Sequence, residues 1–141
     1  MRILVLGHKG MLGHDLVAAF GGHDVTGKDI EDFDITSGPD CRELVEENRP
    51  ALVINAAAFT DVDRCETEVE KAFAVNSEGV RNIALACKRQ DVRLVHFSTD
   101  YVFDGTGDHP YLEDDPCNPI NVYGRSKLQG EIYLRELSRN F

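Results

Sequence analysis

The sequence predicts an α/β fold in which a doubly wound parallel sheet carries helices on both faces. Short apolar runs typical of buried strands alternate along the chain with segments of helical periodicity. Glycines follow the first run directly, at the point where a strand would turn into a helix. Only four runs precede the last helical segment, whereas a complete doubly wound fold has about six strands. We therefore expect a fold that is incomplete at its C-terminal end.

The elements follow in order along the chain. Residues 2–6 form a continuous aliphatic run that predicts the first strand, and residues 11–20 place apolar side chains at helical spacing before Gly21 and Gly22. A weaker strand is predicted over residues 24–27, a helix that Pro39 opens over residues 39–48, and a third strand over residues 51–55.

The second half of the chain continues the alternation. We expect one long helix over residues 69–90, a fourth strand over residues 93–98 and a polar loop over residues 104–121. A final helix starts near Tyr123 and runs to the C-terminus. Residues 1–141 are interpreted as one domain.

Composition excludes several classes of protein. Against 15 Lys and Arg stand 25 Asp and Glu, a net charge of −10, which argues against a nucleic-acid partner. No apolar run reaches the ~18 residues of a membrane helix, and Met1 leads straight into the first strand without a signal-peptide pattern. We expect a cytoplasmic protein. The four cysteines lack the spacing of a zinc site, and no metal ligand is predicted.

The glycine loop is the first candidate site. Gly7, Gly10 and Gly13 form a G-x-x-G-x-x-G pattern between the first strand and the first helix. Glycines there let the backbone approach a pyrophosphate, which the helix N-terminus stabilises. In this context a dinucleotide loop is favoured over a plain strand–helix turn.

The end of the second strand leaves the choice of dinucleotide open. A carboxylate such as Asp29 accepts from the ribose hydroxyl of NAD, whereas a cation such as Lys28 suits the 2′-phosphate of NADP. Asp34 and Ile35, slightly further on, are candidates for the adenine end. The cofactor prediction is NADPH or NADH.

Two further strand ends carry polar or small residues. Residues 55–60 contain three alanines against which a cofactor could lie, and residues 98–101 bring the hydroxyls of Ser98 and Thr99 to the same edge. Taken alone, the Ser-Thr-Asp string is more often a turn or a helix cap.

Tyr123 and Lys127 form the strongest pattern. Residues four apart share one face of a helix. An unperturbed tyrosine is a poor acid or base at neutral pH, and a nearby ammonium is expected to lower its pKa. The pair predicts proton transfer to or from a substrate.

Taken together, these motifs resemble the dTDP-4-dehydrorhamnose reductase family, within the extended short-chain dehydrogenase/reductase superfamily, whose Rossmann-type domains bind NAD(P). The resemblance covers essentially the whole chain. It rests on residues 7–13, 55–58, 61–63, 98–105 and 121–127, with Glu66 and Asn76.

The resemblance implies a role for each matching residue. Tyr123 would protonate the C4 oxygen of a 4-keto nucleotide sugar as hydride arrives from the nicotinamide, and Lys127 would lower the pKa of Tyr123 and hold the nicotinamide ribose. Thr99 would hydrogen-bond the keto oxygen, with Asp100 beside the substrate. The remaining cofactor contacts would come from Gly10, Met11 and Leu12 at the pyrophosphate, Asp29, Asp34 and Ile35 at the adenosine, and Ala58, Phe59 and Thr60 in the middle.

Members of this family are about twice as long, and their C-terminal part carries most of the nucleotide-sugar site. The resemblance therefore implies that the 141-residue chain alone binds a dinucleotide weakly and is inactive, and it admits a homodimer of the full-length protein. Two alternatives stay open. One is a nucleotide-sugar epimerase or dehydratase of the same superfamily, and the other is a non-catalytic NADP-binding subunit like the regulatory subunit of methionine adenosyltransferase.

Overall fold

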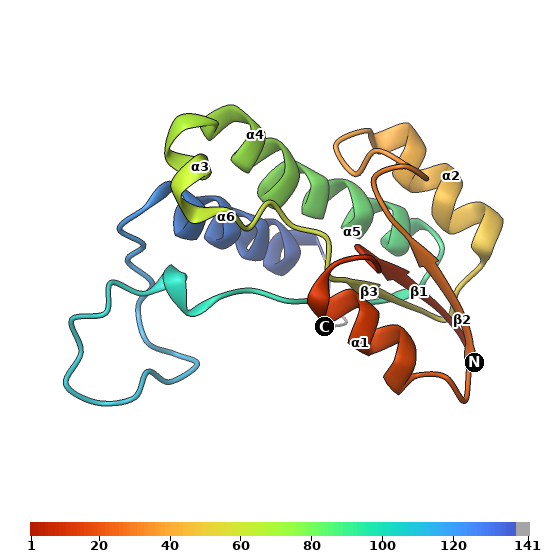
Figure 1. Cartoon of the computed structure of the whole chain (residues 1–141), viewed down its shortest axis with the longest axis horizontal. Helices are drawn as coiled ribbons and strands as arrows, with labels where there is room; N and C mark the ends of the chain where they lie inside the picture. The colour runs from red at the N-terminus through yellow and green to blue at the C-terminus, as the bar shows by residue number, and fades with distance from the viewer. Residues whose placement is uncertain (138–141) are drawn as a thin grey trace.

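A four-stranded parallel sheet forms the centre of the computed structural model, which describes residues 1–137 (Figure 1). Its strands are β1 (Arg2–Leu6), β2 (Asp24–Lys28), β3 (Leu52–Asn55) and β4 (Arg93–His96), in the order β2-β1-β3-β4. Each neighbouring pair is parallel. The predicted fold class and all four predicted strands are confirmed.

The register of the sheet brings the ends of the strands into one row. Leu6 of β1 pairs with Lys28 on one side and with Asn55 on the other, and Asn55 pairs with His96. Because all four strands run in the same direction, the segments that follow them leave the sheet at one edge. Ligands of open α/β sheets bind at this carboxyl edge.

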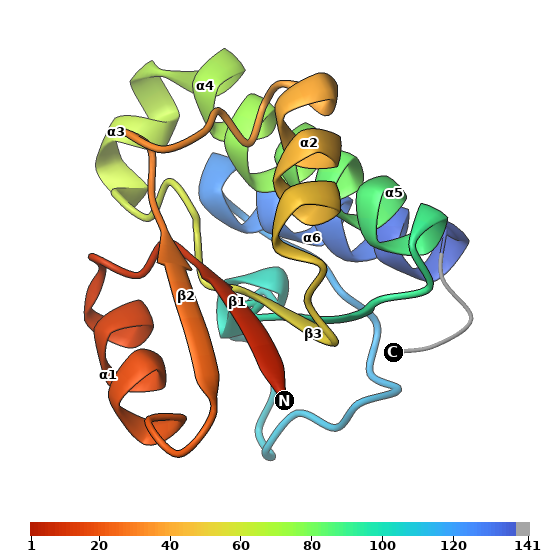
Figure 2. The ribbon, with the colours of Figure 1, turned by 90° about the vertical axis from the view of Figure 1, so that its right-hand side faces the viewer.

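Helices cover both faces of the sheet, as predicted. Helix α1 (Met11–Ala19) packs Leu16 and Val17 on one face, against Ile3, Val5 and Ile54. Helices α2 (Gly38–Asn48), α5 (Gly79–Arg89) and α6 (Val122–Leu137) lie on the other face (Figure 2). The main core forms there, around Leu4, Leu6, Val53, Val80 and Ile83.

Side chains fix the starts of two helices. The Ser37 hydroxyl accepts a hydrogen bond from the Asp40 amide, 3.3 Å away, before α2, and the Asp61 carboxylate accepts one from the Arg64 amide, 3.1 Å away. Asp61 thereby begins helix α3 (Val62–Thr67), which the sequence analysis did not predict. This helix is six residues long and has too few apolar positions to show a helical period.

The long helix expected over residues 69–90 is interrupted. Helix α4 (Val69–Phe73) is followed by a π-helical turn, η1 (Ala74–Glu78), before α5 begins. A π turn adds a residue to the helical repeat and often marks a functional position. The final helix begins where it was expected; its predicted run to residue 141 extends outside the described residues.

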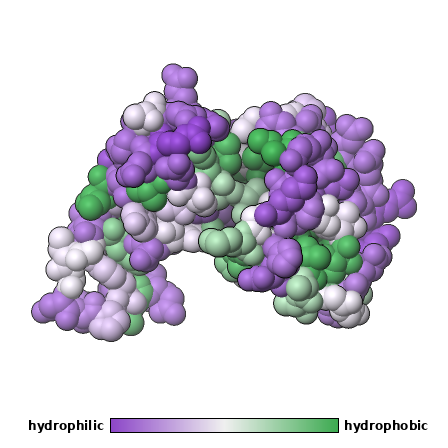
Figure 3. Space-filling model, viewed as in Figure 1, coloured by the Kyte–Doolittle hydropathy of each residue, from purple (hydrophilic) through white to green (hydrophobic). Residues whose placement is uncertain are grey.

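The polar loop of residues 104–121 extends away from the sheet, beyond a short 3-10 turn, η2 (Asp100–Val102) (Figure 1). Hydrophilic residues dominate the face that Figure 3 shows, and the outline is hollowed between this loop and the α1 side. None of the helices in residues 1–137 is long and apolar enough to cross a membrane.

Candidate functional site

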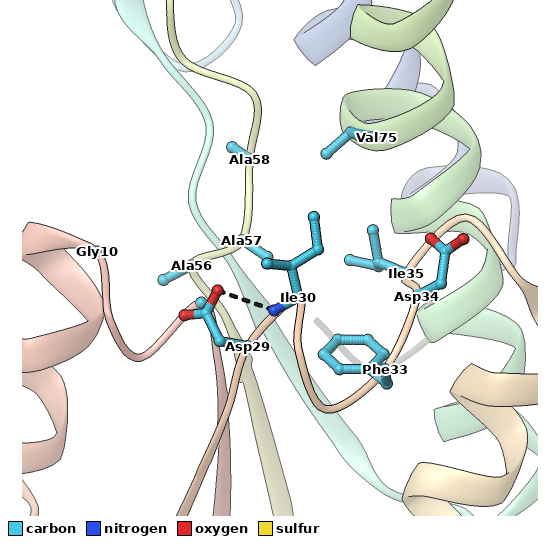
Figure 4. Close-up of a pocket in the computed structure, with 11 residues that line it drawn as sticks. Gly10, Asp29, Ile30, Phe33, Asp34, Ile35, Ala56, Ala57, Ala58 and Val75 are labelled. Atoms are coloured by element: carbon cyan, nitrogen blue, oxygen red, sulfur yellow. Dashed lines mark hydrogen bonds between the residues drawn. The ribbon is translucent and has the colours of Figure 1, made fainter.

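Two adjoining cavities open at the carboxyl edge of the sheet. The first has a volume of about 260 Å³ and lies between the segments that follow β1, β2 and β3 (Figure 4). The second has about 290 Å³ and extends towards α6. Both are lined by Gly10, Ala56, Ala57 and Ala58, so together they form one elongated site.

The predicted glycine loop lies where the two cavities meet. Gly7 has a φ of +76°, and a Cβ on Gly13 would come within 2.0 Å of the Gly7 oxygen, so neither position accepts a side chain. Gly10 caps α1 without a side-chain hydrogen bond. The first amides of α1, at Met11, Leu12 and Gly13, therefore have no partner within the helix, and these three residues line the second cavity. This is the donor arrangement that a phosphate requires.

Asp29 is held at the wall of the first cavity nearest Gly10 (Figure 4). Its carboxylate accepts from the Lys9 amide at 2.8 Å and from the Ile30 amide at 2.9 Å. Burial acts to raise the pKa of Asp29, but these two amides, together with the nearby His8 and Lys9 side chains, outweigh it and the pKa is lowered. Lys28, the cation that left the cofactor choice open, lies 3.9 Å from Asp32 and does not line this cavity.

The remaining walls of the first cavity come from predicted and unpredicted residues. Asp34 and Ile35, the residues predicted for the adenosine end, line this cavity opposite Asp29 (Figure 4). Ile30, Phe33 and Val75 were missed. Only the structure shows that Ile30 is an apolar side chain with 81% of its surface exposed, which is a feature typical of a binding surface.

Tyr123 and Lys127 both line the second cavity, on the side opposite the glycine loop, together with Thr60, Phe97 and Ser98. Both are buried, with 9% and 2% of their surfaces exposed. The start of α6 is fixed by the Glu66 carboxylate, which accepts from the Val122 amide at 2.7 Å, and by Asn121, whose Oδ1 accepts from the Gly124 amide at 2.7 Å. The pair is thus held rigidly at the cavity wall.

The pKa of Tyr123 differs from the expectation. Burial raises it, and a hydrogen bond with the Thr99 side chain is the contribution that lowers it. The predicted lowering by Lys127 is wrong for this arrangement, because Lys127 Nζ turns away to donate to the Phe97 carbonyl at 2.6 Å and to lie 3.3 Å from His96 Nε2. Tyr123 therefore stays a phenol at neutral pH.

The hydroxyls of Ser98 and Thr99, at the end of β4, have different partners. Thr99 lies beside Tyr123, and its Oγ1 also accepts from the Tyr101 amide at 3.2 Å and donates to Asp100 Oδ1 at 3.2 Å. The Ser98 hydroxyl instead donates to the Glu131 carboxylate. Of the two hydroxyls considered for a substrate oxygen, Thr99 is the one the structure brings to the tyrosine.

Asn76, in the π turn, lines neither cavity but supports the walls of the site through hydrogen bonds. It is fully buried; its Oδ1 accepts from the Phe59 amide at 2.8 Å, and its Nδ2 donates to the Phe59 carbonyl at 2.9 Å and to Ser126 Oγ at 3.0 Å. Ser126 Oγ donates in turn to the Tyr123 carbonyl at 2.8 Å. One side chain thus links the segment after β3 to the helix that carries Tyr123.

Phe59 is the predicted cofactor residue that lies elsewhere. It lines neither cavity; its ring packs beside Cys65 and Ala72, with the Lys71 ammonium 4.7 Å from the ring centroid. Its neighbours Ala58 and Thr60 do line the second cavity. Alternation along this extended segment turns Phe59 inward when its neighbours face the site. Among residues 1–137, no three His, Cys, Asp or Glu side chains are placed to hold a metal ion.

Comparison with known proteins agrees with this geometry. The sequence model of the RmlD substrate binding domain matches residues 1–141. A dTDP-4-dehydrorhamnose reductase of Streptomyces griseus is 47% identical over 138 residues, which are 96% of this chain and 45% of the relative. The chain thus spans about half the length of the curated relatives it matches.

Solved structures give the same picture. The dTDP-4-dehydrorhamnose reductase of Bacillus anthracis in complex with NADP superposes with a TM-score of 0.95 at 37% identity, over 99% of this chain and 50% of that one. The Bordetella bronchiseptica enzyme WbmG in complex with NAD and UDP gives 0.86 at 26% identity, over 99% and 50%. With the glycine loop, the Tyr123–Lys127 pair and the sheet order all in place, the chain belongs to the RmlD substrate binding domain family.

Proposed function

We propose that residues 1–141 are the dinucleotide-binding part of an NAD(P)H-dependent reductase that acts on a 4-keto nucleotide sugar of the dTDP-4-dehydrorhamnose type. One observation carries the proposal. The uncapped N-terminus of α1 opens where the two cavities meet, and Tyr123 and Lys127 line the far end of the second cavity. A bound dinucleotide is extended, so it needs an adenosine site, a pyrophosphate site and a nicotinamide site in this order along one groove.

The residues fit a dinucleotide along the whole groove. Asp29 would accept from the adenosine ribose, with Asp34 and Ile35 at the adenine, and the first amides of α1 would hold the pyrophosphate. Ala57 and Ala58 leave room for the cofactor beside the backbone, and Lys127 would hold the nicotinamide ribose. When bound, the reduced nicotinamide supplies a hydride.

The proton would come from Tyr123. Burial keeps its phenol protonated at neutral pH, and the Thr99 side chain stabilises the phenolate that forms when the proton leaves. To hydrogen-bond the keto oxygen as negative charge develops there, Thr99 would redirect the proton that it donates to Asp100 in this structure. Asp100, which accepts from Thr99, would lie beside the substrate.

The relatives support the reaction class. The Streptomyces griseus relative is named a dTDP-4-dehydrorhamnose reductase, and one of Streptomyces niveus is named a dTDP-4-keto-6-deoxy-D-glucose reductase. NADP and NAD are each bound in a related structure. Because this chain spans about half of such proteins, the sugar would be bound largely by residues that these 141 do not supply.

Dinucleotide binding is tested with the 141-residue chain itself. The chain has no Trp, so NADH or NADPH emission can be titrated without indole fluorescence. Gly10→Asp is the test variant, because a Cβ there comes no closer than 3.3 Å to another atom and the added carboxylate would repel the pyrophosphate. Gly22→Asp, with nothing within 4 Å, adds the same charge away from the site.

We expect weak binding by the wild type and by Gly22→Asp, and none by Gly10→Asp. Equal binding by both variants would refute the proposed cofactor site. Reduction itself is assayed in a protein that joins these residues to the second half present in the relatives. Release of oxidised cofactor in step with sugar reduction supports a reductase, whereas turnover with the cofactor retained would identify an epimerase or dehydratase.

A further inference from the structure

A chain of three polar side chains, of which Asn55 and Lys127 are buried and His96 is half-buried, runs from the sheet to the proposed active site. Asn55 ends β3 and is fully buried, His96 pairs with it at the end of β4, and Lys127 lies above them on α6. Asn55 Nδ2 lies 3.2 Å from His96 Nδ1, and His96 Nε2 lies 3.3 Å from Lys127 Nζ. The proposed mechanism uses Lys127 but neither of the other two.

The hydrogen-bonding capacity of these groups identifies the tautomer of His96. The Ala57 amide donates to Asn55 Oδ1 at 3.1 Å, and a backbone amide can only donate, so the oxygen of the Asn55 side chain is fixed on that side. Asn55 Nδ2 then faces His96 and donates to Nδ1. A neutral imidazole that accepts at Nδ1 carries its proton on Nε2. This proton points at Lys127.

The Nε2–H group has a consequence for Lys127. An ammonium has three N–H donors and no lone pair, whereas an amine has two donors and one lone pair. The amine satisfies every contact here: it accepts from His96, donates to the Phe97 carbonyl at 2.6 Å and keeps one N–H for the cavity. The ammonium would place two donors against each other.

We propose that His96 is a positioning residue for Lys127: Asn55 fixes its tautomer, and its Nε2–H group, with the Phe97 carbonyl, holds Nζ at the cavity and favours the amine. The inference rests on the proposed function, in which Lys127 binds the nicotinamide ribose beside Tyr123. It assigns a role to a histidine that lies outside every motif of the sequence analysis.

Burial and a nearby carboxylate act on Lys127 in opposite directions. Burial lowers the pKa of Lys127 to about 8, and Glu131, one turn further along α6, opposes this. Burial, helped by Lys127, lowers the pKa of His96 to about 3, with a contact to the Asn55 main chain acting the other way. The titratable groups around Lys127 are thus His96 from β4, and Tyr123 and Glu131 from α6 itself. Glu131 favours the ammonium and His96 the amine.

The tautomer can be read directly by NMR on the ¹⁵N-labelled 141-residue chain. Long-range ¹H–¹⁵N spectra distinguish a protonated from an unprotonated ring nitrogen, and the chain has five histidines, of which His96 is assigned by its loss in His96→Gln. We expect a neutral ring with its proton on Nε2 throughout the neutral pH range. A proton on Nδ1, donated to the Asn55 carbonyl, would overturn the proposal.

Two variants test the effect on Lys127, whose pKa is followed through the ¹³C shift of its ε-carbon. In Asn55→Asp a carboxylate accepts from Nδ1–H, so the ¹⁵N spectrum is expected to show Nε2 without its proton. The pKa of Lys127 is expected to rise through this change and through the added charge. In His96→Gln the side-chain amide keeps an N–H donor, and the pKa is expected to stay close to that of the wild type. Equal shifts in both variants, or none in Asn55→Asp, would contradict the assigned role.

None of these measurements uses a dinucleotide or a substrate. Their failure therefore leaves the proposed reductase function untouched, and a failure of the dinucleotide titration leaves the tautomer result standing. If Asn55→Asp does not fold, the spectrum of the wild type alone still decides which nitrogen carries the proton.

Discussion

Gly130 of α6 lies directly against the main-chain oxygen of Asn76: a Cβ on Gly130 would come within 2.5 Å of that atom. The π turn that exposes this carbonyl also directs the Asn76 side chain to Phe59 and Ser126. The close approach of α6 to η1 thus sets the depth at which Tyr123 and Lys127 lie.

Gly130→Ala is expected to destabilise the fold. The atom in the way belongs to the backbone and cannot rotate aside, so α6 has to shift, at a cost of about 1–3 kcal/mol for an overpacked position. Urea unfolding followed by circular dichroism measures the difference. Gly22→Ala is the control, because nothing lies within 4 Å of its Cβ. Equal losses in both variants would show that the contact is unimportant.

Asn76→Leu is expected to lower the free energy of unfolding by more than Gly130→Ala does. It removes three hydrogen bonds and leaves the half-buried Phe59 amide without a partner and the Phe59 carbonyl with only the Cys65 thiol, at about 1–3 kcal/mol for an unsatisfied group. Dinucleotide affinity should fall too, because Ala58 and Thr60 flank Phe59 in the cavity wall. Unfolding and cofactor titration measure the two effects. Asn48→Ala, which removes a bond to Leu44 within one helix, should change neither strongly.

Hydrophobic pattern predicted most of the fold because buried parallel strands and amphipathic helices carry it in their own residues. It missed α3, whose start depends on the Asp61 cap, and it merged α4, η1 and α5, since a π turn leaves the apolar spacing nearly unchanged. The π turn is favoured by the hydrogen bonds of Asn76 with Phe59 and Ser126, and these contacts between distant segments cannot be read from local spacing.

The same distinction applies to the site. Gly7, Gly13 and Asp29 were found because strand–loop–helix context is local in sequence. The partners of Lys127 were not found, because His96 is 31 residues away and meets it only when α6 packs over the end of β4. Nor does sequence show that the Phe59 ring packs beside Cys65 and Ala72 when its neighbours Ala58 and Thr60 line the cavity, since these contacts form only in the folded chain.

Asp29 is expected to set the preference between the two cofactors. A hydrogen bond to a charged group contributes about 1.5–3 kcal/mol, so Asp29→Asn should weaken NADH and shift the affinity ratio towards NADPH by roughly tenfold or more. Fluorescence titration with both dinucleotides measures the ratio. Glu31→Gln removes a neighbouring carboxylate that pairs with Lys9 at 3.0 Å outside the cavity, and should leave the ratio unchanged.

His96 is expected to make the fold sensitive to acid. Its pKa is about 3 in the folded chain, against the ordinary value of 6.5, so the unfolded chain binds more protons between these two values. Stability contributed by the neutral imidazole is therefore complete above pH 6.5 and is lost as the pH falls towards 3. The slope approaches about 1.4 kcal/mol per pH unit for one group.

His96→Gln removes this proton uptake, because an amide does not titrate. The difference in unfolding free energy between wild type and variant should narrow steadily as the pH is lowered from neutrality, which urea unfolding at a series of pH values measures. Carboxylates titrate in both proteins and cancel in the difference. His14→Gln, at a side chain that is 80% exposed, should run parallel to the wild type. A parallel course for His96→Gln as well would mean that His96 takes up its proton equally in the folded and the unfolded chain. The imidazole would then not be held in its neutral form by Asn55 and Lys127.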